Sequence, residues 1–263
     1  MDKTHKGRVL IVAGSDSGGG AGIQGDIKTV SALGGYAMTA VTALTAQNTR
    51  GVFGVFGVPA EFVAQQIDLC LGDIGADAAK TGMLLNAEII LAVAEHLPTG
   101  VPLVLDPVMV AKGGASLLDP EAIAVLKDRL VPRAALLTPN LPEAGLLLGR
   151  AIDEGALEDE ARALLDLGPK AVLLKGGHGS GDIVTDVLAT EGHAPLVLRA
   201  KRLKTRHTHG TGCALASAVA TGIAQGMALA DAVARAHAYV QHALAAAPGF
   251  GNGNGPLGHW AAN

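Results

Sequence analysis

The chain has 263 residues, of which 49% are hydrophobic and 17% charged, and its formal net charge is −4 at pH 7. A chain this apolar is inconsistent with intrinsic disorder and can fill the core of a large domain. Aromatic residues make up only 3% and no basic run occurs, which argues against a nucleic-acid partner. The 36 glycines follow no G-X-Y period, so they exclude collagen and indicate glycine-rich turns or ligand loops.

Short β-branched segments alternate with longer segments of helical periodicity along the chain. The predicted strands, in chain order, are 9–13, 38–45, 76–80, 102–106, 134–138, 171–175, 183–189 and 196–198. The predicted helices are 23–33, 60–71, 87–97, 121–130, 157–167, 213–226 and 229–246. The pair Asp119-Pro120 predicts the start of the fourth of these helices.

This alternation predicts an α/β fold with a mostly parallel central sheet and helices on both faces. No helix separates the last two strands, which predicts an antiparallel edge. No linker or internal repeat divides the sequence, so residues 1–263 are expected to form one domain.

Two observations bear on the compartment. Cys70 and Cys213 are too few for a disulfide framework. The first apolar run is too short for a signal peptide, and no stretch approaches the ~18 apolar residues of a membrane span. We therefore expect a cytoplasmic protein with no membrane partner.

Polar residues and glycines follow nearly every predicted strand. In an open α/β sheet, ligands bind beyond the carboxyl ends of the strands, so these segments are expected to share one rim. They are 14–22, Gln47-Asn48, 80–83, 106–109, 140–143 and 175–178.

Two nucleotide-binding motifs are disfavoured. Gly20-Ala-Gly22-Ile-Gln-Gly25 formally matches GxGxxG, but the preceding strand is expected to end several residues earlier, near Gly14. The strand predicted at 38–45 also lacks the acidic residue that would bind a ribose. No Gly-Lys dipeptide occurs, which excludes a P-loop.

A stronger phosphate-binding signal lies at His209-Gly-Thr-Gly-Cys213, directly before a predicted helix. Glycines allow backbone N–H groups to converge, and the helix N-terminus adds positive potential, so the turn could stabilise a transferred phosphoryl group. The alternative interpretation is an ordinary glycine-rich helix cap.

Three charged residues on the same rim strengthen the first interpretation. Lys175 can bind nucleotide phosphates, and Asp106 and Glu143 can hold Mg²⁺ directly or through its waters. Each also has a structural alternative: a lysine closing a strand, a turn cap before Pro107 and a first-turn helix acid. Together with the glycine turn, they favour phosphoryl transfer.

The sequence resembles the ribokinase superfamily and, more closely, the hydroxymethylpyrimidine/phosphomethylpyrimidine kinases of thiamine biosynthesis. The segments that carry the resemblance are 13–24 with Asp26, 45–49, 80–83, 105–112, 138–144, 174–178 and 208–213. The resemblance implies a ribokinase-like fold and a homodimer. It also implies a kinase that uses ATP and Mg²⁺ to phosphorylate 4-amino-5-hydroxymethyl-2-methylpyrimidine and then its monophosphate.

The resemblance also implies roles for individual residues. Gln47 would hydrogen-bond the pyrimidine, Gly14 and Asp26 would lie near it, and Met83 and Val108 would form apolar walls. Asp106 and Glu143 would serve Mg²⁺ and the phosphates. The residues facing ATP would be Asn140, Lys175, Gly177, Thr208 and His209, and the anion hole would consist of Gly210, Thr211, Gly212 and Cys213.

The chemistry of two of these residues can be developed further. An amide both donates and accepts hydrogen bonds, so Gln47 suits an aminopyrimidine, although it could also be an ordinary polar strand-end residue. Most of the superfamily has an aspartate general base where this chain has Cys213. The helix N-terminus is expected to lower the pKa of the thiol, so that Cys213 accepts the hydroxyl proton in the first transfer. His209 would share that proton or contact phosphate.

Two other functions stay open: a pyridoxal kinase, alone or as a second activity, and a non-catalytic vitamer or nucleotide sensor. Residues 112–115 could be a mobile flap over the substrate or an exposed loop. The glycine-rich tail at 249–256 resembles the family's C-terminal segment, but its chemistry indicates no role.

Overall fold

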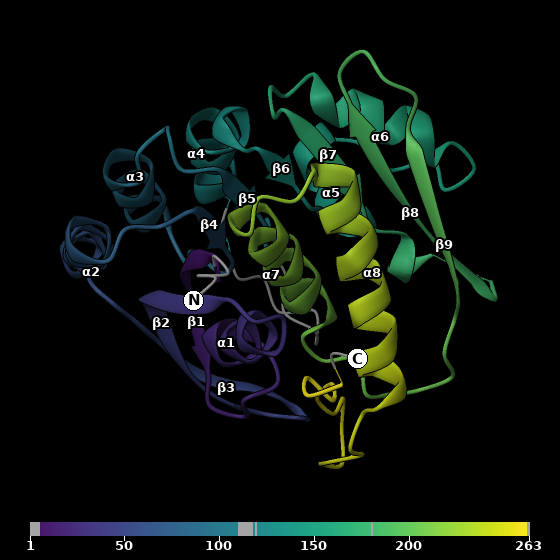
Figure 1. The fold of residues 1–263 in the computed structure, drawn as a ribbon, viewed down its shortest axis with the longest axis horizontal. Helices are drawn as coiled ribbons and strands as arrows, with labels where there is room; N and C mark the ends of the chain where they lie inside the picture. Colours follow the sequence, from purple (N-terminus) through teal and green to yellow (C-terminus); the bar gives the residue numbers. More distant parts are fainter. Residues whose placement is uncertain (1–5, 110–117, 119, 180, 262–263) are drawn as a thin grey trace, which may run out of the picture.

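The computed structural model describes residues 6–109, 118, 120–179 and 181–261, which form a sheet flanked by helices (Figure 1). The strands are β1 (Arg8–Asp16), β2 (Tyr36–Asn48), β3 (Gly51–Gly57), β4 (Ala78–Thr81), β5 (Leu103–Leu105), β6 (Leu136–Leu137), β7 (Ala171–Leu174), β8 (Ile183–Thr190) and β9 (Leu196–Lys201). The α-helices are α1 (Gly22–Ala32), α2 (Ala60–Asp73), α3 (Ala87–His96), α4 (Pro120–Arg129), α5 (Leu141–Leu148), α6 (Leu157–Leu165), α7 (Thr211–Ala224) and α8 (Leu229–Ala245).

The strand order in this sheet is β3-β2-β1-β4-β5-β6-β7-β8-β9. The pairs from β2 through β7 are parallel, whereas β8 and β9 extend the sheet antiparallel at one edge and β3 does so at the other. The predicted α/β class, the mostly parallel sheet and the antiparallel edge after β7 are therefore confirmed.

Alternating side chains of β1 bury themselves in two separate cores. Leu10 and Val12 belong to the core covered by α2 to α6, and Val9, Ile11 and Ala13 belong to the core covered by α1, α7 and α8. A strand buried on both faces reads as a continuous apolar run, which is the pattern of this segment. The prediction of helices on both faces is confirmed (Figure 1).

Two elements were not predicted. The sequence of β3, Gly-Val-Phe-Gly-Val-Phe-Gly, is rich in glycine, which weakens the strand signal, but it pairs with β2 as an antiparallel hairpin. The helix α5 begins within residues 140–143, a segment that was predicted only to lie on the ligand-binding rim. Its start is a capping box, in which Asn140 and Glu143 each bind the other's backbone N–H.

Two predictions fall outside the described residues: the helix cap at Asp119 and the flap at 112–115. The helix α4 begins at Pro120, as the Asp-Pro pair predicted. Among the residues described, no helix combines the length and apolarity needed to span a membrane.

Candidate functional site

A cavity of about 1040 Å³ opens at the carboxyl ends of the parallel strands. It is lined by these predicted site residues: Gly14, Gln47, Met83, Asp106, Val108, Asn140, Glu143, Lys175, Gly177, Thr208, His209, Gly210, Thr211, Gly212 and Cys213. The topology therefore brings together residues that lie up to 199 positions apart in the chain. Gln47 and Cys213 line the same cavity.

Asp26 is the exception among the predicted site residues. It was expected to lie near the pyrimidine, but it lies on α1 with its side chain fully buried, outside the cavity lining. Its two carboxylate oxygens lie 3.0 and 2.9 Å from Nζ of Lys80, and Oγ of Ser217 donates to Oδ1 at 2.7 Å. The carboxylate is thus committed to a buried ion pair beneath the site.

Lys80 was not identified as a functional residue from the sequence. It sits near the end of β4, is fully buried, and lines the floor of the cavity. Burial alone would lower its pKa, but the Asp26 carboxylate raises the pKa above its usual value and keeps the ammonium charged. A lysine near the end of a short apolar strand was the available signal, because a charge there needs a buried partner.

The turn before α7 has the geometry expected of an anion-binding site. Gly210 adopts φ of +88°, and a Cβ at this position would overlap the carbonyl oxygen of Gly20. Its carbonyl accepts the first helical hydrogen bond, from Ala214 N at 2.8 Å. The N-terminus of α7, with Thr211, Gly212 and Cys213 in its first turn, therefore faces the cavity and offers it positive potential.

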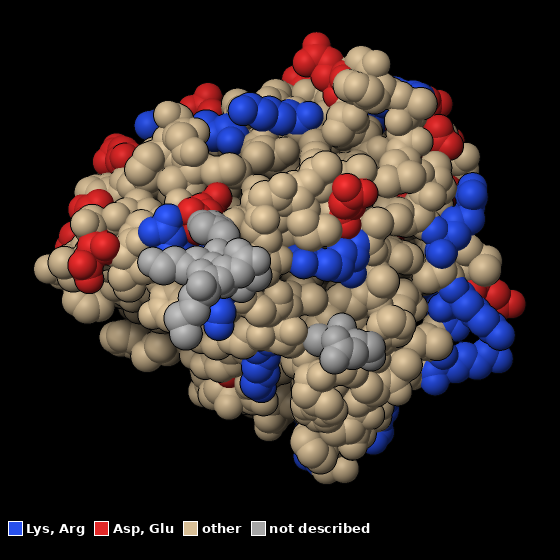
Figure 2. Space-filling view, in the orientation of Figure 1, with Lys and Arg blue, Asp and Glu red and all other residues tan. Residues whose placement is uncertain are grey.

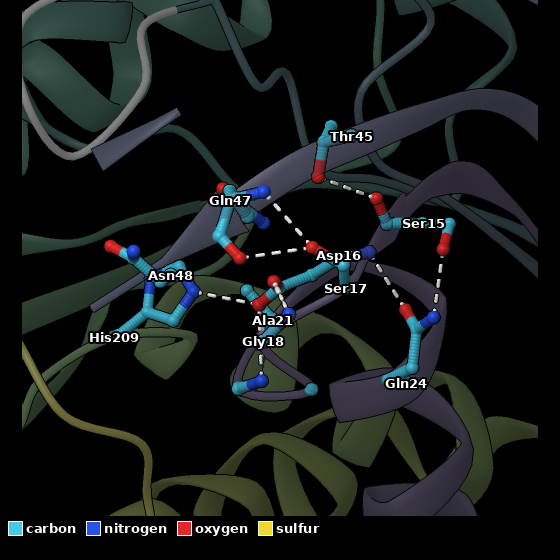
Figure 3. A network of polar contacts seen from close by, with 12 residues as sticks. Ser15, Asp16, Ser17, Gly18, Ala21, Gln24, Thr45, Gln47, Asn48 and His209 are labelled. Carbon is cyan, nitrogen blue, oxygen red and sulfur yellow. Dashed lines mark hydrogen bonds and ion pairs between the residues drawn. The ribbon is translucent and has the colours of Figure 1, made fainter. Parts of the chain in front are cut away.

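The first glycine-rich loop is fastened to this turn by Asp16 (Figure 3). Oδ2 of Asp16 accepts from the backbone N–H groups of Gly20 (3.0 Å) and Ala21 (2.8 Å) and lies 2.8 Å from Nε2 of His209. Burial alone would raise the pKa of Asp16, but the hydrogen bonds from His209 and the loop amides lower it to about 2. The carboxylate is therefore ionised at neutral pH and holds His209 in place.

Gln47 is joined to the same loop through its backbone (Figure 3). Its N–H donates to Oγ of Ser17, and that hydroxyl donates to the carbonyl oxygen of Gln47, both at 2.9 Å. The side-chain amide lines the cavity, and no hydrogen bond to it is found within the described part of the chain. Its donor and acceptor are available to a ligand.

Three charged residues of the cavity lining lie close to one another beside the anion-binding turn. Nζ of Lys175 lies 2.9 Å from Oδ1 of Asp106, which also accepts from Oγ1 of Thr138 at 3.2 Å. Glu143 lines the cavity while its Oε2 accepts from the backbone N–H of Asn140 at 2.8 Å. Burial, with a further contribution from Asp106, raises the pKa of Glu143 to about 7, although Lys175 opposes this.

This donor set fits a magnesium ion that is carried by nucleotide phosphates. Mg²⁺ typically binds proteins through one or two carboxylates and completes its shell with waters and phosphate oxygens. Asp106 and Glu143 supply two carboxylates. No group of three or more acidic, histidine or cysteine residues suited to hold a metal without such help occurs in the described ranges.

The thiol of Cys213 differs from expectation. The residue is half-buried and its thiol accepts a hydrogen bond from the Gly22 backbone. Burial of the thiol, reinforced by the nearby carboxylates of Asp26 and Asp106, raises its pKa to about 11, even though Lys80 lowers it. The expectation that the pKa of this thiol is lowered is therefore wrong, because desolvation of the thiolate is the larger effect.

Two basic residues that were not predicted from the sequence, Lys201 and Arg202, belong to the cavity lining. Arg202 donates to the carbonyl oxygens of Gly177, Gly179 and Gly181 and so orders the loop after β7. Figure 2 shows that basic side chains gather on the side of the molecule where β9 lies. The sequence Lys-Arg-Leu-Lys at 201–204 was the available signal, so the expectation that the chain has no basic run is wrong.

The chain is similar to known proteins in both sequence and fold. Residues 16–258 match the family model described as phosphomethylpyrimidine kinase. A hydroxymethylpyrimidine/phosphomethylpyrimidine kinase of Streptomyces coelicolor is 51% identical over 96% of this chain and 94% of its own length. The thiamine biosynthesis bifunctional protein ThiED of Geobacter sulfurreducens is 52% identical over 97% of this chain, which spans about half (52%) of that protein.

Solved structures of two kinds resemble the fold. A phosphomethylpyrimidine kinase from Clostridium difficile gives a TM-score of 0.78 at 40% identity, covering 90% of this chain and 98% of that one. The pyridoxal kinase from Staphylococcus aureus in complex with AMP-PCP and pyridoxal gives 0.89 at 32% identity, covering 98% and 94%. Both similarities extend over nearly the whole chain.

Proposed function

Because the chain belongs to the phosphomethylpyrimidine kinase family, we propose that it phosphorylates 4-amino-5-hydroxymethyl-2-methylpyrimidine with ATP and then converts the monophosphate to the diphosphate. The reaction belongs to thiamine biosynthesis. One observation carries the proposal: a single cavity is lined both by Gln47, which can pair with an aminopyrimidine, and by the anion-binding turn that ends at Cys213.

The pyrimidine side of the cavity combines one polar group with apolar walls. The Gln47 amide is suited to pair with the ring nitrogen and the amino group, because it offers an acceptor and a donor. Met83 packs against Gly14, where a Cβ would come within 2.7 Å of the Met83 methyl group. Oγ1 of Thr42 donates to the Met83 carbonyl at 2.6 Å and fixes that wall. Val108 adds a second apolar contact.

The nucleotide side supplies positive charge and N–H donors. Lys175 would bind the phosphates, Asn140, Gly177 and Thr208 would contact ATP, and the turn at 210–213 would stabilise charge on the phosphoryl group in transfer. Asp106 and Glu143 would hold Mg²⁺, which supplies charge neutralisation at the phosphates when bound.

We assign Cys213 the role of base for the first transfer only. An alcohol must lose its proton as the phosphorus–oxygen bond forms, and Cys213 lines the cavity at the helix N-terminus. With a pKa of about 11, only a small fraction of Cys213 is thiolate at neutral pH, and that fraction is the form that accepts the proton. The second acceptor is a phosphate monoester, which is already ionised near neutral pH and requires no base.

Pyridoxal phosphorylation is the second candidate activity, because pyridoxal kinases of known structure share the fold at a TM-score of 0.89. The available amide of Gln47 favours an aminopyrimidine over a ring that lacks the exocyclic amine. A non-catalytic sensor is disfavoured, since it would need neither Lys175, Glu143 nor the anion-binding turn.

A coupled ADP-release assay with hydroxymethylpyrimidine, its monophosphate and pyridoxal in parallel tests the proposal. We expect release with both pyrimidines in the presence of Mg²⁺, and chelation by EDTA should abolish it. Release with pyridoxal alone would support the second candidate. No release with any of the three would support the sensor and contradict the proposed function.

The described strands form one continuous sheet, which supports one domain over residues 1–263. Both cysteines are free, which supports a reducing compartment, the cytoplasm.

We also propose that two copies of the chain pair through the edge strand β3. Phe53 and Phe56 are 73% and 68% exposed on this last strand of the sheet, and an exposed apolar edge is unfavourable in an isolated subunit. Light scattering on a sizing column should give a dimer mass for the wild type and a monomer mass for Phe53→Asp/Phe56→Asp. Leu146→Asp, an exposed position on α5, is the control that should stay dimeric; a dimeric double variant would contradict the proposal.

A further inference from the structure

The chain does not end with its last helix. After α8 it continues as a glycine-rich segment, Gly249–His259, which we call the C-terminal strap (yellow in Figure 1). The strap contains almost no regular structure, yet several of its residues are buried. The function proposed above assigns it no role.

One side of the strap is bonded to the chain just beyond the pyrimidine-side residue Gln47. The backbone N–H of Asn254 donates to the Thr49 carbonyl at 2.7 Å, and that of Gly253 donates to Oγ1 of Thr49 at 3.2 Å. Thr49 and Asn254 both line the cavity, so the strap forms part of its wall.

The other side of the strap is bonded to the anion-binding turn. The backbone N–H of His209 donates to the Gly255 carbonyl at 3.1 Å, and His209 forms an isolated β-bridge with Pro256. His209 directly precedes Gly210, the residue whose conformation starts α7. The Asp16 carboxylate holds the His209 side chain, so the strap provides a second and independent tie, to its main chain.

The far end of the strap is anchored in the protein interior. Leu257 is buried in the core between the sheet, α1, α7 and α8. The N–H of Gly258 donates to the Ala243 carbonyl at 2.9 Å, and Oη of Tyr239 donates to the carbonyl of His259 at 3.0 Å. Residues 253–256 are therefore fixed at both ends, by this anchor and by the site.

Glycine is required at Gly253, Gly255 and Gly258 because of close approach rather than unusual dihedral angles, and the first two lie between the two sides of the site. A Cβ at Gly253 would overlap the Thr49 carbonyl oxygen, the same oxygen that accepts from Asn254. A Cβ at Gly255 would overlap Nδ1 of His207 and the carbonyl oxygen of Phe250. None of the three glycines has a positive φ. The two closest approaches within the strap, at Gly253 and Gly255, thus lie in the part that joins the two sides of the site.

We propose that the C-terminal strap is a positioning element, in which Gly253 and Gly255 let residues 253–256 clamp the Thr49 turn to His209 and so set the distance between the bound acceptor and the phosphoryl group. The rate of phosphoryl transfer depends on the distance between the attacking oxygen and the phosphorus atom. A displacement of about 1 Å can lower the rate on the order of 100-fold. This inference rests on the proposed kinase function.

Gly253→Ala is the test, since it pushes the strap off Thr49 without altering a residue that lines the cavity. We expect kcat to fall at least about tenfold for both transfers. Dissociation constants for the pyrimidine and for a non-hydrolysable ATP analogue, measured by calorimetry, should stay within about threefold, because each half of the site is intact. Amide hydrogen exchange of the 207–213 peptide should accelerate.

Gly100→Ala is the matched control, because no atom lies within 4 Å of its added Cβ and its φ is not positive. It should match the wild type in all three measurements. A second pair covers the case in which Gly253→Ala does not fold. Thr49→Val removes the hydroxyl that Gly253 binds and should shift kcat and exchange in the same direction, while Thr49→Ser should restore both.

Unchanged kcat and exchange in a folded Gly253→Ala would overturn the proposal, as would a loss of kcat that only follows the folded fraction seen in thermal melts. Unchanged kcat and exchange in Thr49→Val would do the same. A wild-type protein that phosphorylates neither pyrimidine contradicts the proposed function instead, and the exchange measurement still tests the clamp.

Discussion

Cys213→Ala is expected to lower kcat for phosphorylation of the hydroxymethyl group by a factor on the order of 10² to 10⁴, the usual contribution of a general base. Phosphorylation of the monophosphate should fall much less, because its acceptor oxygen is already ionised. The two reactions share one cavity and one nucleotide site, so a general defect in folding or ATP binding would lower both rates equally.

The dependence on pH distinguishes a base from a packing residue. With a pKa of about 11, the thiolate fraction of Cys213 rises about tenfold per unit between pH 7 and pH 10. The rate of the first transfer should therefore rise with pH in the wild type, whereas the Cys213→Ala variant should show no such rise. Glu143, with a pKa of about 7, affects both transfers, so the ratio of the two rates isolates the thiol.

Cys70→Ala is the control, since Cys70 lies on α2, outside the cavity lining, and should leave both rates unchanged. Equal losses in both transfers, or a first transfer whose pH profile survives the Cys213→Ala substitution, would remove Cys213 from the role of base. The anion-binding turn could still act through its backbone donors, which the substitution leaves in place.

Lys80→Met is expected to destabilise the protein by about 3–5 kcal/mol, because it leaves the fully buried carboxylate of Asp26 without its cation. The hydrogen bond from Ser217 would remain, but it stabilises the protein by less than the free energy that burying an unpaired carboxylate costs. Urea denaturation followed by circular dichroism gives the free energy of unfolding.

A double-mutant cycle separates the pair from the rest of the core. Asp26→Leu alone leaves a buried ammonium, whereas Lys80→Met/Asp26→Leu removes both charges, so the double variant should lose less stability than the sum of the single variants. Arg162→Met breaks the exposed pair with Asp159 and should cost less than about 1 kcal/mol. A cost for Lys80→Met as small as that for Arg162→Met would show that the buried pair contributes little.

The fold was predictable to the extent that its determinants are local. Apolar runs such as Val9–Ala13 show their burial in their composition, and the absence of a helix between β8 and β9 requires an antiparallel edge. The strand β3 escaped prediction because glycine lowers strand propensity, and only pairing with β2 stabilises it. The helix α5 was not predicted, although its first-turn proline and the Asn140–Glu143 capping box are helix-start signals and Glu143 had been considered as a first-turn helix acid.

The sequence allowed us to predict most of the residues that line the site, but not which groups surround each of them. Residues that follow parallel strands must share a rim, so Gln47, Asp106 and Lys175 could be grouped from sequence alone. The turn at Cys213 follows the antiparallel strand β9, and the resemblance to the kinase family placed it in the same site. Asp26 could not be placed, because its partners Lys80 and Ser217 lie 54 and 191 positions away. The direction of the Cys213 pKa shift could not be predicted either, since desolvation depends on the atoms packed around the thiol.

Strand and helix periodicity, the glycine turn and the charged residues of the rim are properties of neighbouring residues, and they sufficed to indicate a sheet with a phosphate-binding edge. Burial of a charge, the pKa of a thiol and the clamp made by residues 253–256 on Thr49 and His209 depend on groups that meet only after folding. The physical reason is that desolvation and close packing are set by the three-dimensional neighbourhood of an atom, which local sequence does not specify.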